Sequence, residues 1–546
     1  MVNLTIDGQA VQVEPGTSII MAAKKLNIKL DVPHYCFHEG LSVAGNCRIC
    51  LVEIEKVPKL QISCATPVAE GMVVYTASDK VKAARQGVME FLLVNHPIDC
   101  PICDCAGECR LQDYYMQHGL HDSRIPLEQK VRKKKVVDIG RHVILDSERC
   151  ILCSRCVRFC EEVPKTGELG IFNRGSFSEL SLQEGMRLEN DYSGNVVDIC
   201  PVGALTDKSF RFRSRVWFLR ETPSVCPGCE RGCNIYIHHN DHAQNKVGSE
   251  RVYRLKPRFN DDVNKWWMCD EGRYGYSSID GNRVEFPQAL TSGARTPLSW
   301  DEAFLRLTNA LSGITKDDSA AVIASPHLTN EELYLVKKLF KDGLKLAKVH
   351  YGDDLLRAGK EDNILLKADR SPNRAGARAV ADSPSAGPRV SARQILDDAK
   401  AGKIKTLILL DCDLDLYFDA SEIEAALSKV AKKISFSSHR NLLYEKLVDL
   451  IIPVAVYAEK DGTFTNFEKR VQRIYPAFPP IAQAKTSTEI FDVLSQKMNL
   501  GWHFEKSAEI FDALTREVPA FEGLSYSKIG DLGKPMSPEV VHKSAG

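Results

Sequence analysis

The chain has no long hydrophobic run and no excess of charge of either sign. A membrane helix needs roughly 18–20 apolar residues, whereas the apolar stretch around 450–458 is shorter and contains Pro453. Lys plus Arg and Asp plus Glu each number 72 among 546 residues, which argues against nucleic-acid binding through bulk charge. The N-terminus lacks the basic and then apolar pattern of a secretory signal. We therefore expect a cytoplasmic protein that reaches a membrane only through partners.

Nucleotide-binding and catalytic motifs are also absent. There is no G-x-G-x-x-G after an expected strand and no G-x-x-x-x-G-K-[ST], so the sequence indicates no site for NADH or ATP. No paired carboxylates or nucleophile arrangement with convincing context occur, and we predict no catalytic residue in this chain. What the sequence does contain is 18 cysteines, of which 17 lie between Cys36 and Cys269 and only Cys412 follows. Without a secretion signal, most are expected to be metal ligands or free thiols.

The first cysteine set has the spacing C-x10-C-x2-C-x13-C and consists of Cys36, Cys47, Cys50 and Cys64. Alternating apolar residues over 1–12 with a turn at Asp7-Gly8 predict a hairpin, and the pattern over 18–26 predicts a short amphipathic helix. This order resembles a plant-type [2Fe-2S] ferredoxin with a lengthened loop. Four soft thiolates suit two tetrahedral irons, and structural zinc on the same residues is the alternative.

The second set combines one histidine with three cysteines: His96, Cys100, Cys103 and Cys109. Apolar residues at helical spacing predict a helix over 79–95, which the His96-Pro97 step ends. A neutral imidazole can replace one thiolate on a [4Fe-4S] cluster, and this normally raises the reduction potential. A lone histidine at a helix end often serves only the helix dipole. Its spacing to three cysteines favours ligation, and we interpret Cys105 as a bystander.

The third set is Cys150, Cys153 and Cys156 with the remote Cys200, which precedes Pro201. C-x2-C-x2-C followed by a distant Cys-Pro is a strong [4Fe-4S] ferredoxin signal. Cys160 mimics the ligand that serves a second cluster in two-cluster ferredoxins. The chain lacks the other cysteines of such a cluster, so we expect Cys160 to bind none.

The fourth set is Cys226, Cys229, Cys233 and, after a long gap, Cys269. Its C-x2-C-x3-C and distant C-x2-G-R resemble the N-terminal [4Fe-4S] domain of the molybdopterin oxidoreductase superfamily. A zinc ribbon is the alternative here as well.

The order of the four sets is more specific than any one of them. The chain resembles the large iron–sulfur subunit of bacterial respiratory complex I, the NADH:quinone oxidoreductase. The segments that carry the resemblance are VNHPIDCPICDCAGECRLQD (94–113), RCILCSRCVRFC (149–160), NVVDICPVGAL (195–205) and CDEGRYGY (269–276). Two departures are a long loop between Cys233 and Cys269 and a C-terminal region that is short for the family.

The resemblance implies a multidomain α+β and α/β architecture with one [2Fe-2S] and three [4Fe-4S] clusters. We expect a β-grasp ferredoxin-like domain at 1–78, a small helical [4Fe-4S] domain at 79–120 and a ferredoxin-type domain at 121–218. A molybdopterin-oxidoreductase-type [4Fe-4S] domain is expected at 219–277, and a degenerate α/β domain with a C-terminal tail at 278–546.

In the second half, short apolar runs alternate with helical patterns. The runs at 320–324 and 406–411 predict buried parallel strands, and the segments at 299–311, 330–340 and 391–401 predict helices. This alternation implies an α/β domain, with a long loop over 370–389. Cys412 ends an apolar strand, which favours a plain buried thiol. We therefore expect no molybdenum and a vacant, structural domain.

The resemblance also implies function and partners. A flavin-containing NADH-oxidising subunit and its small [2Fe-2S] partner would deliver single electrons, and downstream iron–sulfur subunits would pass them to quinone. The complex couples this transfer to proton translocation, and the chain would lie peripherally on the cytoplasmic face of the inner membrane.

Alternatives remain open from the residues alone. One is the catalytic chain of an NAD-linked molybdenum formate dehydrogenase, and another is a non-redox scaffold with structural zinc. An iron-only hydrogenase shares the N-terminal modules but would need cysteine motifs that are missing after Cys269. We further expect the basic run 130–135 to be a solvated linker, with a partner-docking patch as the alternative, and 533–546 to be a mobile or partner-binding tail.

Overall fold

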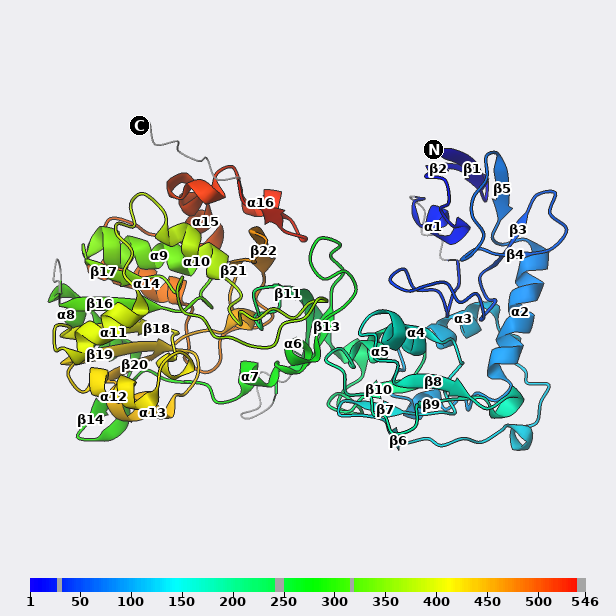
Figure 1. Cartoon of the computed structure of the whole chain (residues 1–546), viewed down its shortest axis with the longest axis horizontal. Coiled ribbons are helices and arrows are strands. Elements are labelled where there is room, and N and C mark those ends of the chain that lie inside the picture. The colour runs from blue at the N-terminus through cyan, green and yellow to red at the C-terminus, as the bar shows by residue number, and fades with distance from the viewer. Residues whose placement is uncertain (27–31, 241–249, 315–318, 538–546) are drawn as a thin grey trace. The chain divides into compact units, whose positions relative to one another are not determined.

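The computed structural model describes residues 1–26, 32–240, 250–314 and 319–537. The chain forms two compact units, Met1–Leu219 and Arg220–Gly546, and each is described by itself (Figure 1). Among the described residues, the search for a helix long and apolar enough to span a bilayer finds none.

The first unit begins with a five-stranded sheet in the order β2-β1-β5-β3-β4. Its strands are β1 (Val2–Ile6), β2 (Gln9–Val13), β3 (Leu51–Ile54), β4 (Gln61–Ile62) and β5 (Met72–Tyr75). The expected hairpin joins β1 to β2, and its turn places Asp7 at φ 45° and Gly8 at φ 82°, as hairpin turns of this length require. The expected helix is α1 (Ile19–Lys24), which buries its apolar residues against the sheet.

The rest of the first unit consists of short elements that carry the Cys loops. They are α2 (Asp79–Leu93), α3 (Arg110–His118), α4 (Arg155–Glu162) and α5 (Asn195–Ile199), a small sheet of β6 (Val137–Asp138), β7 (Val143–Leu145) and β10 (Leu205–Asp207), and the hairpin of β8 (Leu169–Phe172) and β9 (Glu179–Leu182). Helix α2 occupies the segment expected for it and ends before His96.

The second unit starts with an antiparallel sheet of β11 (Arg220–Val225), β12 (Asn234–His239) and β13 (Val252–Pro257). Its centre is a seven-stranded sheet in the order β15-β14-β20-β19-β18-β16-β17. The strands are β14 (Gln288–Thr291), β15 (Ala294–Pro297), β16 (Ala320–Ala324), β17 (Lys348–His350), β18 (Thr406–Leu410), β19 (Lys432–Ser437) and β20 (Leu450–Pro453). The five adjacent strands β17, β16, β18, β19 and β20 run parallel, as expected of an α/β domain.

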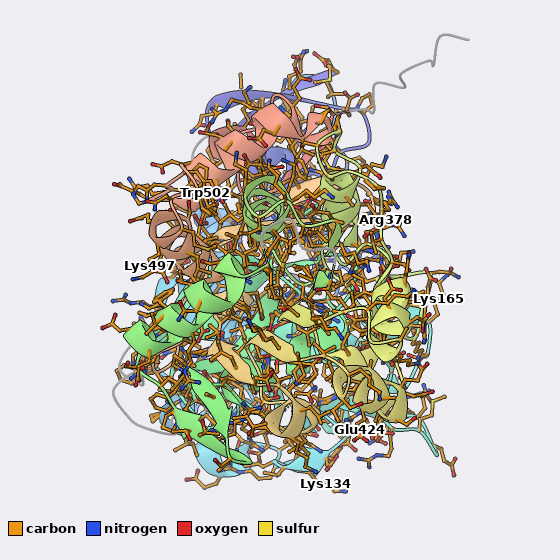
Figure 2. The ribbon with its side chains drawn as sticks, turned by 90° about the vertical axis from the view of Figure 1, so that its left-hand side faces the viewer. Lys134, Lys165, Arg378, Glu424, Lys497 and Trp502 are labelled. Carbon is orange, nitrogen blue, oxygen red and sulfur yellow. The ribbon has the colours of Figure 1, made fainter. Side chains whose placement is uncertain are left out.

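Helices cover both faces of this sheet. Val322 and Ile408 point into a core with α8 (Trp300–Ser312), α9 (Asn330–Val336), α14 (Ser487–Lys497) and α15 (Ser507–Glu517). Their neighbours Ile323 and Leu407 point into a second core with α11 (Ala392–Lys400), α12 (Ala420–Leu427) and α13 (Leu442–Leu447). Charged side chains such as Lys497 and Glu424 lie on the outer faces of these helices (Figure 2).

Three expectations for the second half need correction. The segment 370–389 is not a continuous loop, because Arg374–Ala381 forms α10; its alanines favour a helix despite the glycine and prolines nearby. The helix expected over 330–340 changes after Val336 to a π-helical stretch, Lys337–Gly343. The expected tail is ordered at its start, where β23 (Lys534–Pro535) pairs with β22 (Arg470–Ile474), next to β21 (Gly462–Thr465). Residues 538–546 lie outside the described residues.

A buried ion cluster joins the sheet to the segments that surround it. The Glu459 carboxylate accepts hydrogen bonds from Arg283 Nη2 at 2.8 Å and Arg251 Nη2 at 2.6 Å. Burial by itself would raise the pKa of Glu459, but the two guanidinium groups hold it below its ordinary value. The carboxylate therefore stays ionised as the counter-charge of two arginines.

We expect Glu459→Ala to lower the free energy of unfolding of the second unit by about 3–5 kcal/mol, because it leaves the buried Arg283 without a counter-charge and Arg251 with Asp280 alone. Urea denaturation followed by circular dichroism measures this change. Glu424→Ala, at an exposed position of α12, serves as the control and should change the stability by less than about 0.5 kcal/mol. Equal midpoints for the two variants would contradict the prediction.

Candidate metal centres and the cavity of the second unit

The structure brings the four predicted ligands of the first set together. Thiol hydrogen bonds link Cys36 to Cys47 and Cys64, and Cys50 to Cys64. The backbone N–H of Cys36 also lies 3.4 Å from Cys47 Sγ. Hydrogen bonding from Cys64 lowers the pKa of Cys50 to about 6. Cys50 directly precedes β3 and Cys64 follows the edge strand β4, whereas Cys36 and Cys47 come from the preceding loop; together they form a four-thiol cradle.

In the second set, Lys130 holds His96 at the end of α2 through the backbone carbonyl of the histidine. Lys130 Nζ donates to the carbonyls of Leu93 at 2.7 Å and His96 at 2.8 Å. Burial lowers the pKa of His96 to about 4, so its ring is neutral at pH 7, as a metal ligand requires. Lys130, at the start of the run 130–135, is buried because free carbonyls at the helix end attract it. The exposed residues of the run lie in a segment without regular structure, as expected of a solvated linker: Arg132, Lys134 and Lys135.

The thiols of the second set are linked through the extra cysteine. A hydrogen bond with Cys105 lowers the pKa of Cys109 to about 7, and backbone N–H groups at the start of α3 act in the same direction. Cys100 and Cys103 both lie close enough to Cys109 for their charges to interact. The structure thus groups the three predicted thiols around Cys109. No direct contact joins His96 to them among the described residues.

The third set lines one small cavity. Cys150, Cys153, Cys156 and Cys200 all border it. Burial raises the pKa of Cys150 to about 12 and that of Cys200 to about 11, so both thiols keep their protons until a metal displaces them. Backbone N–H groups that follow Cys200 point at its sulfur. Cys160 does not line this cavity; its thiol instead contacts Glu168.

The fourth set also lines a single cavity, in the second unit, with Cys226, Cys229, Cys233 and Cys269 around it. Cys269 caps α6 (Asp270–Tyr274), and its sulfur accepts from the Gly272 N–H at 3.3 Å. Burial raises the pKa of Cys226 to about 12. Residues 241–249 of the long loop in this set lie outside the described residues.

The sulfurs of two sets pack directly against glycines, and a side chain there would displace them. A Cβ atom on Gly203 would lie 2.3 Å from Cys103 Sγ, and one on Gly272 would lie 2.9 Å from Cys226 Sγ. Such contacts leave no room for a side chain. Four thiols, or three thiols and an imidazole, suit an iron–sulfur cluster. In the described part of the chain, no three His, Cys, Asp or Glu side chains form a recognisable single-ion site.

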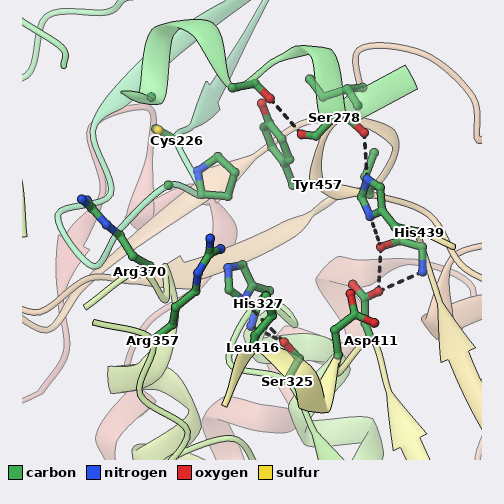
Figure 3. Close-up of a pocket in the computed structure, with 18 of the residues that line it drawn as sticks. Cys226, Ser278, Ser325, His327, Arg357, Arg370, Asp411, Leu416, His439 and Tyr457 are labelled. Carbon is green, nitrogen blue, oxygen red and sulfur yellow. Dashed lines mark hydrogen bonds between the residues drawn. The ribbon is translucent and has the colours of Figure 1, made fainter. Parts of the chain in front are cut away.

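A larger cavity of about 520 Å³ lies at the carboxyl ends of the parallel strands (Figure 3). Ser325 and His327 follow β16, Asp411 follows β18, and Ser438 and His439 follow β19. Ser438 Oγ donates to Asp411 at 2.7 Å, and His439 Nε2 bonds the Ser278 carbonyl at 2.8 Å. This edge of a parallel sheet is where α/β domains bind ligands.

The cavity shares a wall with the fourth set. Cys226, Gly228, Glu271, Gly272 and Arg370 border both spaces. Arg370 forms an ion pair with Glu271 at 2.7 Å. Of the described residues that line the larger cavity, Cys226 is the one cysteine. Cys412 is 2% exposed and packs in the core on the α12 side of the sheet, as expected for a plain buried thiol.

Sequence reasoning missed the arginines that lie among the cysteines. Arg149 forms an ion pair with Asp99 at 2.8 Å and lies 3.4 Å from Asp146. Arg155 and Arg158 are both buried on α4. The available signal was their position inside the cysteine run itself, where a solvated cation is not expected.

Family models match five segments of the chain. A 2Fe-2S iron-sulfur cluster binding domain matches 1–79, the NADH-ubiquinone oxidoreductase-G iron-sulfur binding region 85–124, and the ferredoxin-like domain of NADH-quinone oxidoreductase subunit 3 140–206. A molybdopterin oxidoreductase Fe4S4 domain matches 219–281, and molybdopterin oxidoreductase matches 371–497. The fold and these domains define an iron–sulfur electron-transfer protein with a molybdopterin-oxidoreductase-like unit, which confirms the predicted fold class.

Named relatives identify the family. The NADH-quinone oxidoreductase G subunit of Rickettsia bellii (strain RML369-C) is 30% identical over an alignment that covers 96% of this chain and 90% of the relative. The NADH-ubiquinone oxidoreductase 75 kDa subunit of Reclinomonas americana is 39% identical over 68% of this chain and 52% of the relative. A solved NAD+-reducing [NiFe]-hydrogenase chain is 28% identical over 39% of this chain and 91% of that chain, with a TM-score of 0.35. The chain belongs to the family of NADH-quinone oxidoreductase G subunits.

We expect Gly203→Ala to remove about four iron atoms per chain, one [4Fe-4S] cluster, because the added methyl group overlaps Cys103 Sγ. Iron and acid-labile sulfide analysis of the anaerobically purified chain measures the loss. Gly87→Ala is the matched control, because a Cβ there meets nothing within 4 Å. Wild-type iron in the Gly203 variant would contradict this account of the second set.

Proposed function

We propose that this chain conducts single electrons within an NADH:quinone oxidoreductase through one [2Fe-2S] and three [4Fe-4S] clusters. The first, second, third and fourth sets would hold them in that order, with His96 as the one nitrogen ligand and the other ligands all thiolates. When bound, the clusters supply one-electron oxidation and reduction. The protein residues hold the clusters, exclude water and set their potentials.

The observation that carries this proposal is the convergence of three sets in one buried region of the first unit. A single apolar cluster contains or contacts cysteines of all three sets. Its other buried members are Tyr35, Ile49, Met89, Leu111, Tyr114, Val202 and Ala204. A shared apolar core keeps redox centres close together and shields them from solvent. Electron conduction requires both conditions, whereas separate structural zinc sites require neither.

The contacts between the sets support an order of transfer. The third set lies beside both of the others: the charges of Cys153 and Cys36 interact, and Cys200 interacts with Cys105, which is hydrogen-bonded to Cys109 of the second set. The backbone N–H of Arg110, next to Cys109, also donates to the Pro201 carbonyl at 3.1 Å. We propose that electrons pass from the first set to the third and then to the second.

The partners follow from the family. A flavin-containing NADH-oxidising subunit and its small [2Fe-2S] partner would supply the electrons, because a flavin can take two electrons and release them singly. Downstream iron–sulfur subunits would receive them, and the complex would place the chain peripherally on the cytoplasmic face of the inner membrane.

We also propose that the domain boundaries are those predicted from the sequence. We further propose that the cavity of the second unit binds no molybdenum, which the core position of Cys412 supports.

Anaerobic metal and acid-labile sulfide analysis tests the cluster content. We expect about 14 iron atoms and matching sulfide per chain, from one two-iron and three four-iron clusters, and no molybdenum. About 10 iron atoms would remove one four-iron cluster from the proposal. Near-stoichiometric molybdenum would favour the formate dehydrogenase alternative, and zinc without sulfide would reject electron transfer.

The order of transfer is tested by removing the third set. In a complex that carries Cys153→Ala and Cys156→Ala, NADH should still reduce the first cluster rapidly, whereas reduction of the second should slow at least about a hundredfold, because its donor is missing. Freeze-quench electron paramagnetic resonance separates the two signals. Cys160→Ala, on the same helix but outside the cavity, is the control. Reduction of the second cluster at the wild-type rate would contradict the order.

A further inference from the structure

Helix α4 carries two buried arginines that have no carboxylate partner. Arg155 and Arg158 are 5% and 7% exposed. Arg155 Nη1 donates to the Ile199 carbonyl at 3.0 Å, and its Nη2 donates to the Phe37 carbonyl. Its Nε lacks a hydrogen-bond partner among the described residues. Among the described residues, neither the Arg155 nor the Arg158 guanidinium group forms an ion pair. Arg149, a few residues earlier, pairs with Asp99 at 2.8 Å.

Arg158 lies between the loops of the first and third sets. Its Nη2 donates to the Cys36 carbonyl at 2.5 Å and is 3.5 Å from the Cys153 carbonyl. Its Nη1 donates to the Ser42 carbonyl, in the loop of the first set. One guanidinium group therefore touches the backbone of a predicted ligand from each set. Asn46 Nδ2, which donates to the Leu152 carbonyl at 3.2 Å, joins the same two loops.

Burying a cation without a counter-charge is strongly unfavourable, and carbonyl oxygens compensate it only in part. For Arg155, the negative groups whose charges interact with it are the thiols Cys153, Cys200 and Cys36. For Arg158, the carboxylate of Glu162 lies one helical turn away and bonds to Ser42 rather than to the guanidinium group. Protonated thiols provide none. Iron binding deprotonates them, and four thiolates outweigh the positive charge of an inorganic iron–sulfur core. The missing counter-ions are therefore the ligated clusters themselves.

We propose that Arg155 and Arg158 are the counter-charges of the clusters held by the first and third sets, and that Arg158 serves both at once. The inference rests on the ligand sets proposed above. A fixed positive charge stabilises the reduced, more negative form of a cluster and so raises its reduction potential. Arginine stays charged at any physiological pH. Because Arg158 faces both loops, it raises both potentials together and leaves the difference between them unchanged.

The test is a redox titration of both clusters in the assembled complex, followed by electron paramagnetic resonance. At the midpoint of the wild type, Arg158→Gln should raise the ratio of oxidised to reduced form about tenfold at both clusters, which corresponds to about 59 mV for one electron. Arg158→Lys keeps the charge and should shift both ratios by less than about threefold. Arg187→Gln removes a charge from an exposed position of the same unit and should leave them unchanged.

Other outcomes overturn the inference. Unchanged potentials in Arg158→Gln, with wild-type iron and sulfide, would show that the charge has no effect. A shift of one cluster only would reject the shared role, and equal shifts in the Gln and Lys variants would indicate a purely structural one. If Arg158→Gln loses iron, Arg155→Gln is titrated instead, with the same direction expected and an unchanged potential again overturning the inference. Absence of clusters from the wild type would reject the ligand sets instead.

Discussion

The first unit depends on bringing twelve predicted ligands, eleven of them thiols, together in its interior, where six of the thiols are buried. Burial keeps thiols such as Cys150 and Cys200 protonated, as their raised pKa values show, and the imidazole of His96 stays neutral. These side chains are thus prepared to exchange protons for iron but not to carry charge without it. The proposed clusters would couple metal binding to folding in this unit, since the loops have few other elements to order them.

The positions of the basic side chains follow from the same constraint. Lys130 binds carbonyls at the end of α2, and Arg149 has carboxylates beside it. Arg155 and Arg158 donate to backbone carbonyls but form no ion pair with a carboxylate among the described residues, so their charges are left for the cluster loops. In the second unit, the buried Arg251 and Arg283 share Glu459 as an internal counter-ion. Their charges are therefore compensated without a cofactor. The first unit is built around its metal groups, and the second unit has a core of its own.

The fold of the second unit also explains how a family scaffold can keep a cavity. Its parallel strands end together, and side chains that follow β16, β18 and β19 meet at that edge. Cys412 follows β18 as well, yet its side chain turns into the helix-covered core while its neighbours Asp411 and Asp413 face the cavity. One residue of register therefore separates a potential ligand from a core thiol.

The sequence by itself determined the module order, the hairpin of the N-terminal sheet, the helix before His96 and two strands of the parallel sheet, β16 and β18, because these depend on local periodicity and on cysteine spacing. It did not predict α10, since alanine within a segment rich in glycine and proline was interpreted as loop. The adjacency of the third set to both others, the arginines shared between loops and the tie from Lys130 to His96 were decided by tertiary structure. Each joins residues far apart in the chain, such as Cys36 and Arg158, and no local pattern encodes a contact at that separation.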